Sequence, residues 1–267
     1  MYEQAKAGLA EQGFTIIPNV FSSAQLGKLA EAIQVASVDG SNVRQSADVF
    51  AIRSLSQQVP VLPGMLWQRL FNNLLNGLPG HYYHAVKDIY FDKPAGSNWA
   101  VPWHQDLLIS VDRQEYISNW TNWTNRHGQW SVQPSAYYLN RLYTVRIHLD
   151  DCDETNGALK VLPGSHKHGI LSDANLQALD KTEAVCANVP KGGLLVMQPL
   201  LVHASSKSSS PTNRRVIHLE FSEGRLPKRL QWREFSQRWT KLEQATDEVS
   251  LFSLPDLQKD NPPSCAC

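Results

Sequence analysis

Residues 101–106, with the sequence Val-Pro-Trp-His-Gln-Asp, place a histidine and an aspartate two positions apart. Because side chains alternate along an extended chain, His104 and Asp106 project from the same face and can reach one cation. Two histidines and one carboxylate on one side of a metal leave three coordination positions open. This arrangement suits Fe(II) when the metal must bind a co-substrate and O2 together. The pattern is short, so by itself it predicts a metal site only weakly.

A third ligand must come from the remaining histidines. His203 follows a Gly-Gly turn and an apolar run, and it precedes a serine-rich loop and Arg214-Arg215. That context places His203 at the end of a strand, where ligands gather in sheet proteins. A single histidine beside an apolar strand is more often a buried structural residue, and His218 is a second candidate. Spacing alone therefore leaves the third ligand open.

The elements that must position these residues change in character along the chain. Helical patterns occupy residues 2–12, a segment that begins at Ser22 or Ser23, and residues 66–78. From about residue 82 the pattern becomes that of short strands, with Pro, Gly, Asn or Asp between most of them. The candidate strands are 85–91, 107–111, 142–149, 158–162, 184–189, 193–198 and 216–221. This order predicts a mostly β fold, an antiparallel sandwich or jelly roll, with the helices packed outside the sheets.

Composition excludes several classes of protein. Lys+Arg and Asp+Glu each number 25, which argues against a broad electrostatic grip on nucleic acid or on an anionic membrane. No apolar run resembles a signal peptide or is long enough to span a bilayer. The four cysteines lack the spacing of a disulfide scaffold. We therefore expect a soluble, reduced, cytoplasmic protein with a single domain over residues 1–267.

Two segments stand apart from this domain. Five of the eight tryptophans lie between Trp99 and Trp130, and they define a tryptophan-rich insertion at about residues 112–138. The insertion is either a surface element held by buried indoles or an aromatic lid over the active site. A lid of this kind would favour a compact apolar or aromatic substrate. The second segment is a C-terminal tail at about residues 245–267, which ends in Pro-Pro-Ser-Cys-Ala-Cys.

Four stretches of the sequence carry a family resemblance. They are Glu-Gln-Gly-Phe-Thr-Ile-Ile-Pro at 11–18, Lys-Pro-Ala-Gly at 93–96 leading to 102–106, residues 149–166 from Leu-Asp-Asp to Pro-Gly-Ser-His, and residues 203–215. Together they resemble the phytanoyl-CoA dioxygenase-like family of Fe(II)/2-oxoglutarate oxygenases, from residue 12 to about residue 221. The resemblance implies a double-stranded β-helix, a cupin-like jelly roll with flanking helices, which agrees with the strand pattern.

The resemblance also implies a set of ligands. His104, Asp106 and His203 correspond to the iron ligands, and 2-oxoglutarate and O2 would be the co-substrates. Arg214, eleven positions after His203, corresponds to the arginine that pairs with the distal carboxylate of 2-oxoglutarate, because its planar fork matches a carboxylate. Ser205 and, more weakly, Tyr90 are candidates to hydrogen-bond the same molecule. Arg215 would point to the opposite face and be solvated.

Substrate contacts are predicted from strand alternation. Thr144, Arg146 and His148 share one face of their strand, and if that face points inward Arg146 can hold an anionic group. Gln105 and Trp103, beside His104, and Thr144 are the other candidates for contacting substrate. No cluster of basic residues stands out to receive the phosphates of an acyl-CoA.

These residues predict hydroxylation of a small molecule, such as a secondary metabolite or an amino-acid-like compound, with release of succinate and CO2. The retained Asp106 favours hydroxylation over halogenation, since halogenases of this fold carry Ala or Gly there. Desaturation, cyclisation, epoxidation and peptide hydroxylation use the same ligands and remain alternatives. A zinc hydrolase and a non-enzymatic jelly-roll binding protein are less favoured. No catalytic residue beyond the metal ligands is predicted, and the oligomeric state stays open.

Overall fold

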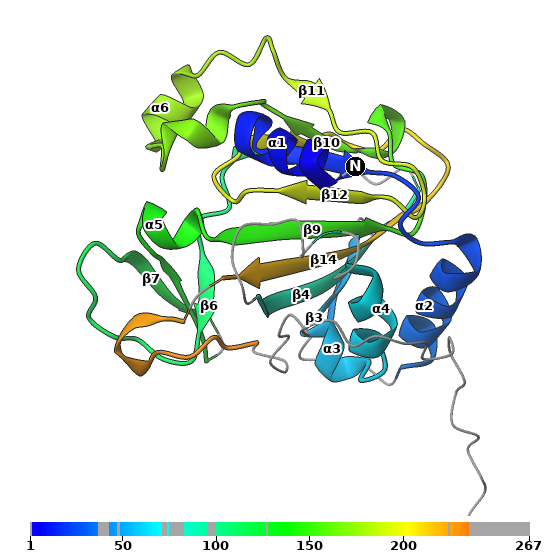
Figure 1. Cartoon of the computed structure of the whole chain (residues 1–267), viewed down its shortest axis with the longest axis horizontal. Coiled ribbons are helices and arrows are strands. Elements are labelled where there is room, and N and C mark those ends of the chain that lie inside the picture. Colours follow the sequence, from blue (N-terminus) through cyan, green and yellow to red (C-terminus); the bar gives the residue numbers. More distant parts are fainter. Residues whose placement is uncertain are drawn as a thin grey trace, which may run out of the picture.

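The structure is a computed structural model that describes residues 2–36, 43–46, 49–70, 74, 83–95, 100–126, 128–223 and 225–234. Figure 1 shows antiparallel strands at its centre and helices from the beginning of the chain on its surface. The predicted C-terminal tail at about residues 245–267 lies outside the described residues. The mostly β jelly roll with flanking helices that the sequence predicted is confirmed.

Two sheets form the jelly roll. The major sheet contains seven strands in the order β1 (Phe14–Ile17), β12 (Leu194–Met197), β9 (Leu142–His148), β14 (Arg214–Ser222), β4 (His84–Lys93), β3 (Val49–Arg53) and β2 (Val43–Ser46). The minor sheet contains β11 (Val185–Cys186), β10 (Leu159–Val161), β13 (His203–Ser205) and β5 (Val101–His104). Apolar side chains of β12 and β10, among them Leu195 and Val161, pack in one buried cluster. The inner faces of the major and minor sheets therefore enclose the interior of the jelly roll.

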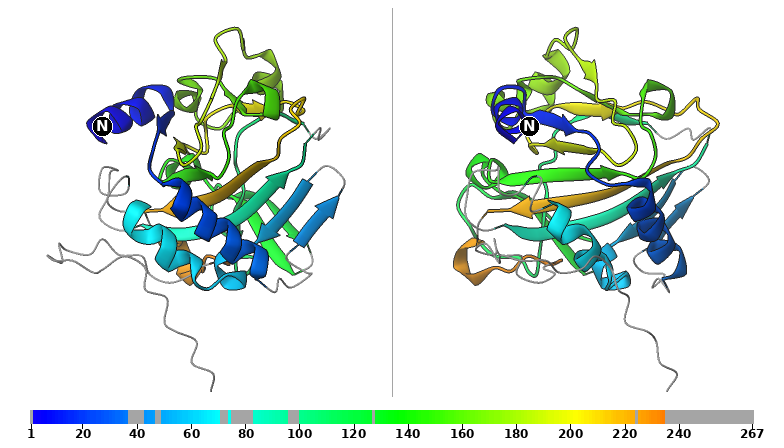
Figure 2. Two further views of the ribbon diagram at one scale, coloured as in Figure 1. Left: turned by 90° about the vertical axis from the view of Figure 1, so that its right-hand side faces the viewer. Right: turned by 45° about the vertical axis from the view of Figure 1, so that its right-hand side comes forward.

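Helices cover the outer face of the major sheet, as the two views of Figure 2 show. They are α1 (Tyr2–Gln12), α2 (Ser23–Val35), α3 (Leu55–Gln58) and α4 (Leu62–Leu70). Leu29 of α2 and Leu66 of α4 pack in one apolar cluster with Ile147 and Ile217 of the sheet. A capping box at Ser22 starts α2, because the Ser22 side chain accepts from the Gln25 backbone and the Gln25 side chain accepts from the Ser22 backbone. These contacts leave the other face of β9 and β14 for the interior.

The third predicted helix begins earlier than expected. The structure starts α4 at Leu62 rather than at residue 66, since Pro63 is compatible with the first helical turn. Of the predicted remainder, residues 71–73 and 75–78 lie outside the described residues. The short helices α5 (Ala136–Leu139) and α6 (Asp173–Ala178) lie between strands later in the chain.

The tryptophan-rich insertion forms a third sheet, in the order β6 (Ile109–Val111), β8 (Gln129–Gln133) and β7 (Thr121–Arg126). One face of this sheet carries apolar side chains. Val111, Val132 and Trp130 lie in an apolar cluster together with Trp120 and with residues 226–232 of the chain. The structure thus supports the interpretation in which indoles anchor the insertion by packing.

Gly192 sits in a turn that joins the N-terminal segment to the major sheet. Its φ is +80°, and a Cβ there would lie 2.1 Å from the carbonyl oxygen of Phe21. The Gly192 carbonyl accepts from the backbone N–H groups of Val20 and Phe21, and its own N–H donates to His148. Gly192-Gly193 therefore forms the Gly-Gly turn that the sequence predicted before His203.

We expect Gly192→Ala to lower the free energy of unfolding by about 2–4 kcal/mol, because left-handed backbone and a backbone clash both oppose a side chain there. Urea denaturation measures this change. Gly27→Ala is the matched control, since a Cβ at Gly27 meets nothing within 4 Å and alanine favours its helix. Equal stabilities of the two variants would contradict the prediction.

Candidate metal centre

The three predicted ligands meet where β5 and β13 pair. His104, the last residue of β5, is the register partner of His203, the first residue of β13. The chain leaves β5 after His104, and the Asp106 N–H donates to the Pro199 carbonyl at 2.9 Å. This bond holds the carboxylate beside both imidazoles. Residues that are far apart in sequence are therefore brought together by one pair of strands.

The ligand atoms face one another. His104 Nε2 lies 3.6 Å from Asp106 Oδ1, and His203 Nε2 lies 3.6 Å from Asp106 Oδ2. One ligand atom from each residue falls within 4.8 Å of the other two. The second ring nitrogen of each histidine lies 2.9 Å from a backbone carbonyl, of Pro102 for His104 and of Leu201 for His203. A carbonyl only accepts, so each Nδ1–H donates and each Nε2 keeps a lone pair for a metal.

The pKa shifts of the three predicted ligands favour protonation states that can bind a cation. Burial alone would raise the pKa of Asp106, but His203 and His104 beside it lower that pKa well below its usual value. Burial lowers the pKa of His203 to about 4 against the opposing effect of Asp106. Burial also opposes the charged form of His104, yet its hydrogen bond and charge interaction with Asp106 give a raised pKa. An ionised carboxylate and a neutral His203 at neutral pH are the forms that bind metals, so the donor set fits Fe(II).

A cavity of about 230 Å³ lies in front of these ligands. Besides the three ligands it is lined by Phe91, Val101, Arg146, Leu159, Ser205, Arg214 and His218. Arg146, Ser205 and Arg214 are thus placed with the triad, where the sequence predicted them. Arg146 and Arg214 reach the cavity from β9 and β14, and both are buried. The inward orientation expected for Arg146 is what the structure shows.

Both arginines retain unused hydrogen-bonding capacity. The Nε atoms of Arg146 and Arg214 are buried without a hydrogen-bond partner in the described part of the chain. Arg214 donates through Nη1 to the Gly157 carbonyl, and Arg146 Nη1 lies 3.3 Å from His218 Nδ1. Burial and the neighbouring Arg214 lower the pKa of Arg146 to about 10. Because unsatisfied buried donors are costly, this face of the cavity is suited to a ligand with acceptor oxygens, as 2-oxoglutarate has.

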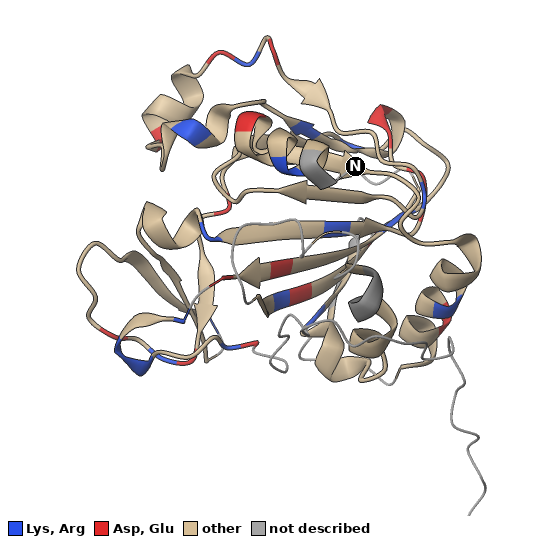
Figure 3. Ribbon diagram, viewed as in Figure 1, with Lys and Arg blue, Asp and Glu red and all other residues tan. Residues whose placement is uncertain are grey.

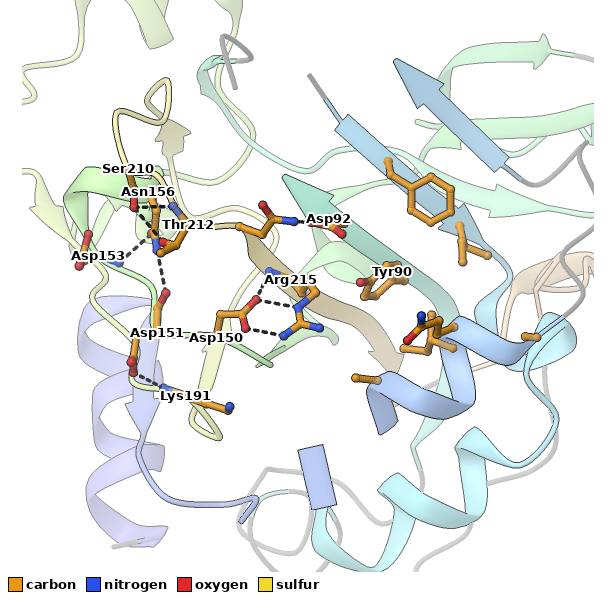
Figure 4. Close-up of a pocket in the computed structure, with 17 residues that line it drawn as sticks. Tyr90, Asp92, Asp150, Asp151, Asp153, Asn156, Lys191, Ser210, Thr212 and Arg215 are labelled. Atoms are coloured by element: carbon orange, nitrogen blue, oxygen red, sulfur yellow. Dashed lines mark hydrogen bonds and ion pairs between the residues drawn. The ribbon is translucent and has the colours of Figure 1, made fainter. Parts of the chain in front are cut away.

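Tyr90 does not reach this cavity, which corrects the prediction for it. It pairs with Ile217 and packs edge-on against Phe50, with ring centroids 6.3 Å apart, in the cluster under the helices. Figure 4 shows Tyr90 with Arg215 in a separate pocket. The residue lies on the outer face because β4 alternates, and its register could not be read from the sequence.

Arg215 shares that outer pocket, as its alternation with Arg214 predicted. It is only partly exposed, however, and forms two hydrogen bonds of 2.9 and 2.7 Å with the carboxylate of Asp150. Arg215 is therefore partly solvated and also paired with a carboxylate.

Two substrate candidates in the metal-binding segment also point elsewhere. Trp103 alternates with His104 along β5, and it is absent from the lining of the cavity. Gln105 is buried, and its amide donates to the carbonyls of Gly169 and Leu200 and accepts from the N–H of Leu171. Its hydrogen bonds tie two loops to the segment between the metal ligands. Gln105 therefore positions the site and leaves little capacity for substrate.

The third candidate, Thr144, lies on the inner face of β9 as predicted, on the same side as Arg146. Its side chain is fully buried, and its hydroxyl lacks a hydrogen-bond partner among the described residues. It is paired with Glu220 and does not line the cavity.

We expect Gln105→Leu to lower the free energy of unfolding by about 2–4 kcal/mol, since three backbone groups lose their buried partner. Chemical denaturation measures the change, with Gln177→Leu on the exposed side of α6 as the control. A Gln105→Leu variant with wild-type stability but no response to substrate would restore Gln105 as a substrate contact.

One cavity residue was not assigned from the sequence. His218 was considered only as an alternative metal ligand, yet it lines the cavity and contacts Arg146. The available signal was its spacing of four from Arg214, which puts both side chains on one face of a strand.

A double-stranded β-helix with a His-Asp-His cluster and a facing arginine defines the class of Fe(II)/2-oxoglutarate oxygenases. Residues 9–216 match the family model for phytanoyl-CoA dioxygenase (PhyH). The chain therefore belongs to the phytanoyl-CoA dioxygenase family, and it is a non-haem Fe(II)- and 2-oxoglutarate-dependent dioxygenase.

Individual relatives are distant. The chain is 20% identical over 252 residues to a probable alpha-ketoglutarate-dependent hypophosphite dioxygenase of Stutzerimonas stutzeri, covering 83% of this chain and 79% of that protein. It is 22% identical over 258 residues to the L-proline trans-4-hydroxylase of Streptomyces griseoviridis, covering 82% and 85%. Among solved structures, EctD from S. alaskensis with 2-oxoglutarate and 5-hydroxyectoine superposes with a TM-score of 0.63 at 19% identity, covering 82% of this chain and 75% of EctD. These structural likenesses support the fold.

Within the described residues, no helix has the length and apolarity needed to cross a membrane.

Proposed function

We propose that His104, Asp106 and His203 bind the Fe(II) of this dioxygenase, and that Arg214 with Ser205 holds 2-oxoglutarate in the adjoining cavity. The observation that carries the proposal is the shared 230 Å³ cavity, which joins three aligned ligand atoms to a buried arginine with an unused Nε–H. Oxidation of a substrate, coupled to conversion of 2-oxoglutarate into succinate and CO2, is the chemistry that Fe(II) and O2 supply there. The chain's own residues orient the reactants and exclude water.

The substrate we propose is a small polar molecule, and its route to the site is a second cavity of about 1200 Å³, named here the polar cleft. Ser110, Thr124, Gln129 and Ser131, on the face of the insertion sheet opposite to the tryptophans, line it. Lys87 of β4, whose ammonium group contacts Glu220 on the inner face, also lines it. This lining, in which Leu108 and Trp232 are the apolar members, favours a polar substrate over the apolar or aromatic one expected of a tryptophan-rich lid.

The charged residues of the polar cleft favour an anionic or zwitterionic molecule. Arg53, Arg126 and Arg233 line the cleft with Lys87, against the acidic Asp112 and Glu234. The sequence showed no such basic cluster, because these residues are far apart along the chain. The relatives named for hypophosphite and L-proline, both small polar compounds, are consistent with this substrate class.

The proposal is tested by succinate formation from 2-oxoglutarate with purified protein, Fe(II) and O2. A panel should contain amino acids, short carboxylates, phosphonates, neutral alcohols, aromatic compounds, a peptide and an acyl-CoA. We expect small anionic or zwitterionic compounds to stimulate succinate release. Stimulation by aromatic compounds or by the peptide alone would contradict the proposed substrate class, and Fe(II)-independent turnover would contradict the proposed metal site.

A further inference from the structure

Two buried guanidinium groups line the metal cavity, and neither forms an ion pair in the described part of the chain. Arg146 and Arg214 are respectively 9% and 5% exposed. Among the described residues that line the same cavity, Asp106 is the one carboxylate, and its oxygens face the two histidines. A buried cation without a counter-ion is costly, so the cavity is incomplete until anions enter it.

The Arg146 guanidinium group belongs to a series of polar contacts that continues through His218 and Glu220 to Lys87. His218 Nε2 lies 3.3 Å from Glu220 Oε1, which also accepts from Lys87 Nζ at 2.6 Å. Because the carboxylate accepts, His218 carries its proton on Nε2, and its Nδ1 lone pair is free to accept from Arg146. A neutral imidazole orients the guanidinium without neutralising it. Glu220 is occupied by Lys87, and its pKa is lowered because the lysine and His218 outweigh the effect of burial.

This series of polar contacts has one end at the metal cavity and the other at the polar cleft. Arg146 and His218 line the cavity and are register partners on β9 and β14, whereas Lys87 of β4 lines the cleft and is the register partner of Glu220. Figure 3 shows acidic and basic positions next to each other on β14 and β4, toward one end of these strands. Arg214 lies at the other end of β14, four residues from His218, and its contact is to the Gly157 carbonyl. Arg146 is therefore the arginine that these contacts link to the polar cleft, the substrate route proposed above.

Charge balance then assigns the two arginines to different ligands, given the proposed function. A divalent metal is balanced by Asp106 and by the carboxylate of 2-oxoglutarate that binds it. The distal carboxylate of 2-oxoglutarate balances Arg214. One positive charge, that of Arg146, remains. We propose that Arg146 is the anchor for a negatively charged group of the substrate, a carboxylate or a phosphorus oxyanion. The enzyme would therefore discriminate against neutral and cationic molecules of the same size.

The test measures binding without turnover. Protein loaded with Mn(II) and saturating 2-oxoglutarate is titrated by calorimetry with acetate, methylphosphonate and neutral acetamide. The variants are Arg146→Gln, the conservative Arg146→Lys, and Arg141→Gln as the control, since Arg141 is partly exposed, precedes β9 and does not line the cavity. We expect wild type to bind at least one anion about tenfold or more tightly than acetamide, a difference of about 1.4 kcal/mol. Arg146→Gln should abolish that preference, Arg146→Lys should keep part of it, and Arg141→Gln should keep all of it.

A separate titration with 2-oxoglutarate distinguishes the two roles of an arginine. Arg146→Gln should change the Kd for 2-oxoglutarate by less than about threefold, because no charge-assisted bond to it is lost. A loss of 2-oxoglutarate affinity as large as the loss of anion affinity would assign Arg146 to the co-substrate and overturn the proposal. Equal binding of acetamide and the anions by wild type would overturn it even if the variants fail to fold. Failure of 2-oxoglutarate to bind wild type would instead refute the proposed function.

Discussion

Asp106→Ala is expected to abolish the dioxygenase activity of this protein. The substitution removes the anionic ligand of the triad and leaves two imidazoles, whose Nε2 atoms both face the Asp106 carboxylate. We expect Fe(II) affinity to fall by more than about 100-fold, since replacing even the groups that only orient metal ligands costs 10- to 100-fold. Succinate formation should fall by about 1000-fold or more, because coupled oxidation needs the metal. Calorimetry with Mn(II) and a succinate assay measure the two effects.

Asp173→Ala is the matched control for this prediction, since Asp173 is an exposed aspartate at the start of α6. It should retain wild-type metal affinity and activity. The Asp106→Ala protein should remain folded, because the substitution removes one partly exposed side chain at the cavity wall and none from the apolar core. Retention of metal affinity within about threefold would show that Asp106 is not a ligand, whatever the activity.

Arg214→Gln carries the second large effect, on the binding of 2-oxoglutarate. Arg214 is buried, has an unused Nε–H, and lies in the cavity that the metal ligands share. Loss of a forked, charge-assisted contact with a carboxylate should raise the Kd for 2-oxoglutarate by about 100-fold, or about 3 kcal/mol. Arg214→Lys should recover only part of this affinity, because an ammonium group is a point charge without the planar fork.

Arg215→Gln provides the comparison at the adjacent position of the same strand. Arg215 points to the outer face and pairs with Asp150, so its loss should cost about 1 kcal/mol of stability or less and leave 2-oxoglutarate binding unchanged. Calorimetric titration of the Mn(II)-loaded proteins with 2-oxoglutarate measures all three variants. The assignment of Arg214 would be rejected if Arg215→Gln weakened 2-oxoglutarate binding as much as Arg214→Gln.

Strand patterns predicted the fold class well but missed several strands. β4, β9, β12 and β14 fall close to their predicted positions, because each is a run of four or more residues with a strong β pattern. The short strands β5 and β13 were not predicted as strands, since three or four residues carry too little periodicity. They nevertheless hold two of the proposed metal ligands. They pair with each other in the minor sheet, where β13 also pairs with the short strand β10.

Site residues that are close in the sequence could be placed from the sequence alone, whereas residues that meet through strand pairing could not. His104 and Asp106 are close in sequence, so alternation along one strand sufficed to place them on one face. His203 could be chosen only through the family resemblance, because its proximity depends on the pairing of β5 with β13. Tyr90 and Gln105 were misplaced since each alternates away from the cavity. The basic lining of the polar cleft was missed because four separate chain segments supply it.

The most direct test of the metal centre is the absorption spectrum of the anaerobic protein with Fe(II) and 2-oxoglutarate added. Chelation of the co-substrate at the metal held by His104, Asp106 and His203 should give a weak visible charge-transfer band in the wild type. The band should be absent from Asp106→Ala and should need a higher 2-oxoglutarate concentration in Arg214→Gln. A wild-type protein that shows no band, or an Asp106→Ala protein with the full wild-type band, would contradict the assignment of these residues.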